Sequence, residues 1–166
     1  MVNVTSQSQP AYFGVLCPLR FNAGKLEVLL TRRAFFSQDK PFSFPGEWVF
    51  PGGGYKQGDR TTANTAIREF REECKYRGAL IPKLLRGNTN GIDFYTTWID
   101  HPEKVGVSEE VIDFAWKRPQ DWLQYLTSES YVQKQERALS QHHLQRQVPL
   151  QTLGTLEYLD KIYGGN

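Results

Sequence analysis

Apolar and polar positions along the chain follow first a strand-like and then a helical pattern. The segments Ala11–Leu19 and Leu26–Thr31 are mostly apolar, which predicts two strands. The turn-forming run Asn22-Ala23-Gly24 lies between them, so we expect a hairpin. Three later segments are expected to be strands by the same criteria: Leu80–Leu85, Ile92–Trp98 and Val111–Trp116. Strands on both sides of a helical segment predict a mixed sheet.

Between the second and third expected strands, apolar residues recur at helical spacing. They form one stripe, made of Ala63, Ala66, Ile67, Phe70 and Cys74. Thr61 or Thr62 can cap the start of this helix, because a threonine side chain accepts a hydrogen bond from a free backbone N–H. One face of the helix is therefore expected to pack, and the other is free for polar chemistry.

The C-terminal part of the chain is expected to be helical. The segment Pro119–Tyr125 begins with a proline, which suits the first turn of a short helix. Residues 128–163 alternate at about helical spacing, and Pro149 divides them into two helices. The pattern as a whole predicts one α/β domain over residues 1–166, with a polar N-terminal tail at residues 1–10.

Composition and charge narrow the function classes. The 166 residues are 39% hydrophobic and 13% aromatic, which suits one compact domain. A net charge of +2 is small for a nucleic-acid-binding surface, so we expect a small anionic ligand and no nucleic-acid partner. Cys17 and Cys74 lack metal-ligand spacing, and neither a signal peptide nor a membrane-spanning run is present. These features predict a cytoplasmic protein without a membrane partner, either monomer or homodimer.

The candidate chemistry lies in a glycine loop and the helix after it. Glu69, Glu72 and Glu73 stand at i, i+3 and i+4, so their carboxylates are expected to converge within one turn. Each like-charged pair destabilises a helix by about a few tenths of a kcal/mol, and a divalent cation among the oxygens reverses that effect. Magnesium or manganese is the expected ion. Arg68, four residues before Glu72, would orient that carboxylate.

A long segment, Phe35 to Gly46, separates the second strand from the glycine loop. It is rich in Phe, Pro and Ser. Loops of this length inside a compact domain are usually functional. We therefore expect it to border the site.

In the glycine loop and helix the chain resembles the Nudix hydrolases. Their box reads Gly, five residues, Glu, seven residues, Arg-Glu-apolar-x-Glu-Glu-x-Gly-apolar, and here it begins at Gly54, after Phe50-Pro51-Gly52-Gly53. The positions that match in register are Arg68, Glu69, Phe70, Glu72, Glu73 and Tyr76. Arg60 stands in place of the first glutamate, and Lys75 in place of the second glycine. The first departure bears on metal contacts or phosphate affinity, and the second on how the helix ends.

Within that family the chain is also similar to the coenzyme A diphosphatases. Asp59-Arg60 and Cys74-Lys75 resemble this branch, and residues 29–34 and 46–53 match the two ends of its upstream signature. The middle of the signature does not match. Residues 35–45 number eleven, which is more than the signature leaves, and its arginine has no clear counterpart.

The resemblance implies an α/β/α sandwich around a mixed sheet, and site residues within it. Glu69, Glu72, Glu73 and the Gly53 carbonyl would bind Mg²⁺ or Mn²⁺, with Glu69 alternatively polarising the attacking water. Substrate phosphate would be held by Arg32, Arg33 and the loop of Gly52, Gly53 and Gly54. The resemblance also implies a further acidic ligand beyond the box, and four residues are candidates for it: Asp100, Glu103, Glu109 and Glu110.

The implied reaction is metal-dependent hydrolysis of the diphosphate linkage in a nucleoside diphosphate derivative. The substrate would be coenzyme A or its thioesters, with ADP-ribose, dinucleotides and oxidised nucleoside triphosphates as alternatives. Because Arg60 and Lys75 depart from the box, a non-enzymatic alternative is also open: a Nudix-fold regulatory module that binds nucleotide without hydrolysing it.

Overall fold

The structure, a computed structural model, describes residues 12–164, so the expected polar tail at residues 1–10 lies outside the described part. The strands are β1 (Phe13–Asn22), β2 (Lys25–Arg33), β3 (Phe36–Ser37), β4 (Lys40–Pro41), β5 (Trp48–Val49), β6 (Gly52–Gly54), β7 (Lys83–Thr89), β8 (Ile92–Trp98) and β9 (Val111–Lys117). The helices are α2 (Thr62–Cys74), α3 (Pro119–Leu126), α4 (Glu129–Ser140) and α5 (Leu150–Tyr163), with short 3₁₀ turns η1 (Gln57–Asp59) and η2 (Pro102–Lys104).

Strand β1 is the centre of the main sheet. It pairs in antiparallel fashion with β2 and β6, and in parallel with β8. Strand β2 pairs with β5 and β9, and β7 pairs with β8, all antiparallel. The predicted mixed sheet is therefore confirmed, with the order β5-β2-β1-β8-β7 along its main path.

The expected β1–β2 hairpin is present, and its turn shows why that sequence makes one. Ala23 and Gly24 have φ of 52° and 77°, the pair of positive angles that a type I′ hairpin turn requires. The strand expected over Leu80–Leu85 starts later, at Lys83. Pro82 just before it has no N–H to give to the ladder, so pairing begins after it.

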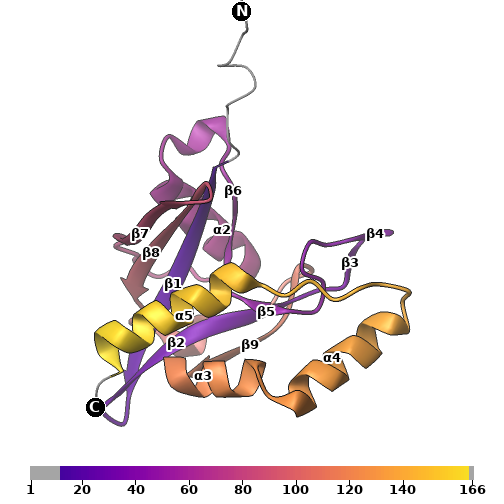
Figure 1. The fold of residues 1–166 in the computed structure, drawn as a ribbon. Coiled ribbons are helices and arrows are strands. Elements are labelled where there is room, and N and C mark those ends of the chain that lie inside the picture. The colour runs from indigo at the N-terminus through magenta and orange to yellow at the C-terminus, as the bar shows by residue number, and fades with distance from the viewer. Residues whose placement is uncertain (1–11, 165–166) are drawn as a thin grey trace, which may run out of the picture.

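Helices cover both faces of the sheet (Figure 1), which confirms the predicted α/β/α sandwich. On one face α2 packs with Phe70 and Cys74 in a core that contains Leu16 and Leu29. On the other face α3, α4 and α5 enclose a second core, made of Cys17, Leu19, Leu26, Val28, Leu30, Trp48, Phe50, Phe94, Trp122, Leu126, Tyr131, Leu156 and Leu159. Each core thus contains one of the two cysteines, and both thiols are free and buried.

Helix α2 has defined ends. The Thr61 hydroxyl accepts a hydrogen bond from the Asn64 backbone N–H at 3.1 Å, so Thr61 is the cap, while the Thr62 hydroxyl donates to Asp93. At the other end Lys75 has φ of 57°. This left-handed conformation is the one that glycine adopts most readily, which explains why the family box has a glycine there.

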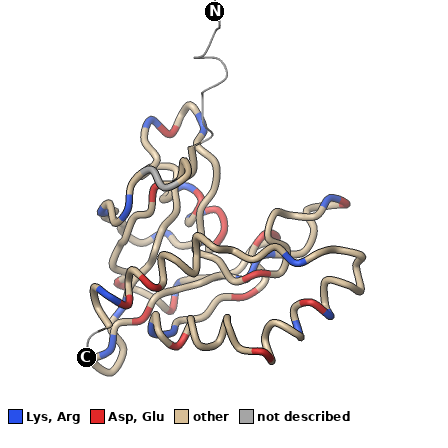
Figure 2. The backbone as a smooth tube through the Cα atoms, in the orientation of Figure 1, with Lys and Arg blue, Asp and Glu red and all other residues tan. Residues whose placement is uncertain are grey.

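Charged residues of both signs are interspersed along the chain (Figure 2), in keeping with the small net charge. Within residues 12–164, no helix has both the length and the apolar character needed to cross a membrane.

Candidate functional site

The glycine loop brings backbone directly against the glutamates of α2. A Cβ added to Gly53 would overlap the Glu69 carboxyl group, so that side chain would have to move. Glycine lets the loop backbone approach Glu69 in the position it has here. The adjacent Gly52 N–H donates to Glu73 Oε1 at 3.2 Å, so the loop and the helix are fixed to each other at the site.

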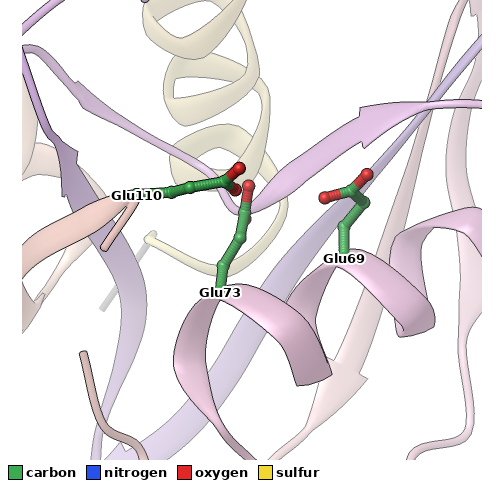
Figure 3. Close-up of side chains that lie close together, drawn as sticks. All are labelled: Glu69, Glu73 and Glu110. Atoms are coloured by element: carbon green, nitrogen blue, oxygen red, sulfur yellow. The ribbon is translucent and has the colours of Figure 1, made fainter. Parts of the chain in front are cut away.

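Three carboxylates meet beside this loop. Glu69 and Glu73 come from α2, and Glu110 comes from the residue before β9 (Figure 3). One oxygen from each lies within 4.8 Å of the others. The Glu110 carbonyl accepts a hydrogen bond from the Ala34 N–H at 2.8 Å, next to the β2–β9 ladder. Pairing of β9 with β2 therefore carries Glu110 to the helix.

The three carboxylates face one another at short range (Figure 3). Glu73 is 3% exposed, and burial, together with the negative charge of Glu69, raises the pKa of its carboxyl from 4.5 to about 8. Burial also raises the pKa of Glu69, although Arg68 opposes that rise. Such a set of hard oxygen donors fits Mg²⁺ or Mn²⁺, whose charge would remove the repulsion.

Arg68 is held by several acceptors, and Asp59 is the main one. Its guanidinium donates to both Asp59 carboxylate oxygens at 2.8 and 3.0 Å, to the Gly54 carbonyl at 3.0 Å and to Glu69 at 3.1 Å. The hydrogen bond from Arg68 holds the pKa of Asp59 well below its usual range. Arg68 thus ties the glycine loop to one carboxylate of the cluster. Asp59 stands beside Arg60 in the box, and sequence reasoning did not give it this role.

Glu72, expected among the metal ligands, is not part of the carboxylate cluster. Its side chain is 54% exposed and accepts a hydrogen bond from Arg68 at 3.4 Å. Of the four acidic residues left open beyond the box, the structure brings Glu110 to the cluster. Glu109 is exposed beside it, and Glu103 pairs instead with His101 at 3.5 Å.

The two arginines after β2 diverge. Arg33 lines the cleft beside the carboxylates, and its positive charge lowers the pKa of Glu73. Its Nε donates to the Ser43 carbonyl at 2.9 Å, and its guanidinium lies over the Phe42 ring. Arg32 instead donates to the Gly46 carbonyl and to Gln135, outside the cleft lining. Of the two expected phosphate ligands, the structure thus brings only Arg33 to the cleft.

The cleft has a volume of about 590 Å³ and joins the carboxylates to an apolar wall. The loop between β4 and β5 contributes Ser43 and Phe44, and α5 contributes Thr152, which agrees with the expectation that the long loop borders the site. The full lining is Phe13, Val15, Arg33, Ser43, Phe44, Val49, Phe50, Gly52, Gly53, Gly54, Glu69, Glu73, Ile92, Phe94, Glu110, Pro149 and Thr152.

Comparisons with known proteins identify the family. The NUDIX domain family model matches residues 11–153. The nucleoside triphosphatase NudI of Escherichia fergusonii is 29% identical over 128 residues, covering 67% of this chain and 85% of that protein. The Ap4A hydrolase of C. elegans, in a binary complex, has a TM-score of 0.54 at 20% identity and covers 78% of this chain and 98% of its own.

NrtR of Shewanella oneidensis provides two further matches. Its NUDIX domain with ADP ribose gives a TM-score of 0.50 at 18% identity, covering 83% of this chain and 99% of that domain. NrtR with a 27mer DNA gives 0.52 at 16% identity, covering 91% and 61%. These identities show a shared fold alone. Because one such structure holds DNA, the absence of a nucleic-acid partner for this chain stays a prediction.

The family model covers most of the chain, and the sandwich, the glycine loop and the glutamate helix agree with it. This chain therefore belongs to the NUDIX family and is a Nudix hydrolase, an enzyme that acts on nucleoside diphosphate derivatives.

Proposed function

We propose that the protein hydrolyses a phosphoanhydride bond in nucleoside triphosphates or similar nucleotides that carry one base and one phosphate chain. The observation that carries this proposal is the composition of the cleft. Among its described lining residues Arg33 is the only cationic side chain, and it lies at the carboxylate end. The remaining wall is mainly apolar, with Phe13 and Phe44 partly exposed.

Such a cleft fits a substrate whose charge is gathered at one end. Coenzyme A carries a 3′-phosphate on its ribose in addition to the diphosphate, and the apolar wall offers no described cation for it. The 29% identity to a protein named as a nucleoside triphosphatase supports the same choice. The two signature fragments at residues 29–34 and 46–53 keep coenzyme A as a substrate to be tested.

In this proposal Glu69, Glu73 and Glu110, with the Gly53 carbonyl, hold a divalent metal ion. The bound ion would lower the pKa of water and neutralise charge on the phosphate oxygens. The terminal nitrogens of Arg33 make no hydrogen bond to other described residues, so they are available to bind a phosphate oxygen pair.

The remaining roles belong to residues around this centre. Arg68 keeps Glu69 and the Gly54 carbonyl in place, as a residue that orients metal ligands. The rings of Phe13 and Phe44 offer apolar faces to a nucleobase.

Product analysis tests the reaction. The purified protein is incubated with Mg²⁺, or with Mn²⁺, and with nucleoside triphosphates, oxidised nucleoside triphosphates, ADP-ribose, dinucleotides or coenzyme A. We expect nucleoside monophosphate from a triphosphate and no product in EDTA. Faster release of phosphopantetheine from coenzyme A would overturn the substrate choice. Binding of nucleotide without hydrolysis of any substrate would overturn the proposed reaction.

The metal ligands are tested with two neighbouring glutamates. Glu110→Gln removes a carboxylate of the cluster, and Glu109→Gln changes the exposed residue beside it. We expect Glu110→Gln to lower kcat by about a hundredfold or more, because the metal ion would lose one of its three carboxylate ligands. Glu109→Gln should keep the wild-type kcat. Equal losses in both variants would remove Glu110 from the proposed ligand set.

A further inference from the structure

A buried carboxylate lies between the long loop and the C-terminal helices. Glu47, just before β5, is 1% exposed. Arg146, in the connection between α4 and α5, donates to both of its oxygens at 3.1 and 3.2 Å. From α4, Gln135 donates at 2.9 Å and Tyr131 at 3.2 Å. Four hydrogen bonds from the C-terminal segment therefore converge on one side chain.

Stability alone gives little reason for this arrangement. Burying two charges removes them from water, and a well-packed apolar pair of similar size is often as stable. Arg146 is 13% exposed in its side chain, so the pair is largely withdrawn from solvent. A buried pair of this kind does fix geometry, because each partner is strongly destabilised if the other moves away. The feature that it fixes is the position of the loop before Glu47.

The loop is attached to the same C-terminal segment at further points. The Phe44 N–H donates to Gln147 Oε1 at 2.7 Å. The Arg32 guanidinium joins the Gly46 carbonyl to Gln135, at 3.0 and 3.3 Å. On the loop these contacts lie within three residues of Glu47. On the C-terminal side they reach Gln147, next to Arg146, and Gln135, which also binds Glu47.

Phe44 needs this support because its backbone is unfavourable. Its φ is 51°, a left-handed conformation that a bulky side chain seldom adopts. Such conformations persist only where the surroundings impose them. Phe44 lines the cleft, as do Arg33 and Ser43, which are joined by the hydrogen bond from Arg33 Nε. A change in the loop would therefore move an aromatic wall and the proposed phosphate ligand together.

We propose that Glu47, Tyr131, Gln135 and Arg146 form a clamp that positions the nucleotide-binding wall of the cleft, and that Arg146 is a positioning residue for substrate. The inference rests on the proposed function, since it takes the cleft to be the nucleotide site. The clamp is separate from the carboxylate cluster, because none of its four residues lines the cleft. It therefore acts on substrate affinity rather than on the chemical step.

The test compares two arginines that each donate to a carboxylate through two nitrogens, Arg146 in a buried pair and Arg118 in a more exposed one. Arg146→Gln breaks the clamp, and Arg118→Gln breaks a pair with Asp121 at 2.9 and 3.2 Å that lies outside the cleft lining. We expect Arg146→Gln to raise KM for a nucleoside triphosphate about tenfold, the equivalent of about 1.4 kcal/mol, with kcat within about twofold. Arg146→Lys should recover part of the loss, since lysine restores the charge but not the paired geometry.

A second measurement does not depend on turnover. The amides of Phe44 and Gly46 donate to Gln147 and to the Arg33 carbonyl, so both should be protected from hydrogen exchange. We expect faster exchange at both amides in Arg146→Gln and no change in Arg118→Gln. Gln147→Ala, at an exposed position, should release Phe44 alone. If Arg146→Gln does not fold, Arg146→Lys gives the same comparison, with a smaller rise in exchange expected at both amides.

The outcomes separate the clamp from the proposed function. Suppose that the wild type hydrolyses nucleotide. An unchanged KM in Arg146→Gln, or a fall in kcat as large as the rise in KM, would then overturn the clamp and leave the function intact. If the wild type hydrolyses no nucleotide, the proposed function fails, and unchanged exchange at Phe44 and Gly46 would overturn the clamp independently.

Discussion

Replacing the buried Glu73 by glutamine should make the metal-free protein more stable at pH 8 while it removes activity. Glutamine keeps an oxygen that can accept from the Gly52 N–H, the bond seen at 3.2 Å, so the loop contact survives. What disappears is a carboxyl group whose pKa is raised from 4.5 to about 8 by burial and by Glu69. The variant therefore isolates the contribution of this buried carboxyl group to stability.

The sign of the pH dependence follows from proton uptake. Between pH 4.5 and about 8 the folded protein holds a proton on Glu73 that the unfolded chain has lost. The contribution of Glu73 to stability is therefore fully present below pH 4.5 and is lost as the pH rises through about 8. A pKa shift of this size corresponds to about 5 kcal/mol over the whole range, at about 1.4 kcal/mol per pH unit.

Urea unfolding in EDTA at pH 5 and pH 8 measures this effect. We expect the wild type to lose several kcal/mol of unfolding free energy between these pH values, and Glu73→Gln to lose much less. Mg²⁺ should restore the wild type at pH 8, by about 2.7 kcal/mol at a hundred times its Kd, and should restore Glu73→Gln less.

Glu72→Gln is the matched control, because this neighbouring carboxylate is 54% exposed. It should keep the wild-type pH dependence in EDTA. If Glu73→Gln follows the same pH dependence as the wild type, Glu73 is not held protonated by burial, and the electrostatic account of the cluster is wrong.

Two further substitutions test the surroundings of the carboxylates. Gly53→Ala would place a Cβ against the Glu69 carboxyl group and displace it, so kcat should fall at least about tenfold. Gly58→Ala, where no atom lies within 4 Å of the added carbon, should keep its rate. Equal rates in the two variants would refute the close approach. Asp59→Asn removes the negative charge that Nε and Nη2 of Arg68 contact. Mg²⁺ affinity or activity should therefore fall about ten- to hundredfold, as measured by titrating the rate against metal concentration. An unchanged metal titration would show that Asp59 does not position Arg68 for the site.

The helix at the centre of the site shows how far sequence reasoning reached. Its existence, its cap and its apolar stripe follow from spacing that is local in the chain. The structure confirms the helix and its cap, and it places Ala66, Phe70 and Cys74 in the core, while Ala63 and Ile67 are half-buried. The spacing also placed Glu69, Glu72 and Glu73 on one face, but these residues differ in their angle to the stripe. At 100° per residue, Glu73 lies about 60° from Phe70, Glu69 about 100° and Glu72 about 160°. Glu72 is therefore farthest from the packed side, so the helical spacing alone could have predicted that its side chain is exposed.

Other parts of the site depend on pairing that no local pattern contains. A strand over Val111–Trp116 was predicted, but its partner was not, and only the pairing of Arg33 with Val111 brings Glu110 to the helix. The same holds for Glu47, whose partners are more than eighty residues away in the chain. Neither charge nor spacing indicates a buried carboxylate at that position. Arg32 and Arg33 likewise look equivalent in sequence, and the strand's alternation sends them in different directions.

The two free cysteines give each layer of the sandwich its own chemical reporter. Cys17 lies in the core under α3, α4 and α5, and Cys74 lies in the core under α2. Burial raises the pKa of both thiols, so neither reacts readily while its layer is closed. A thiol reagent therefore labels Cys74 when the metal-site helix lifts from the sheet and Cys17 when the helices on the opposite face do. The relative rates of the two reactions would report whether the sandwich opens as one unit or one layer at a time.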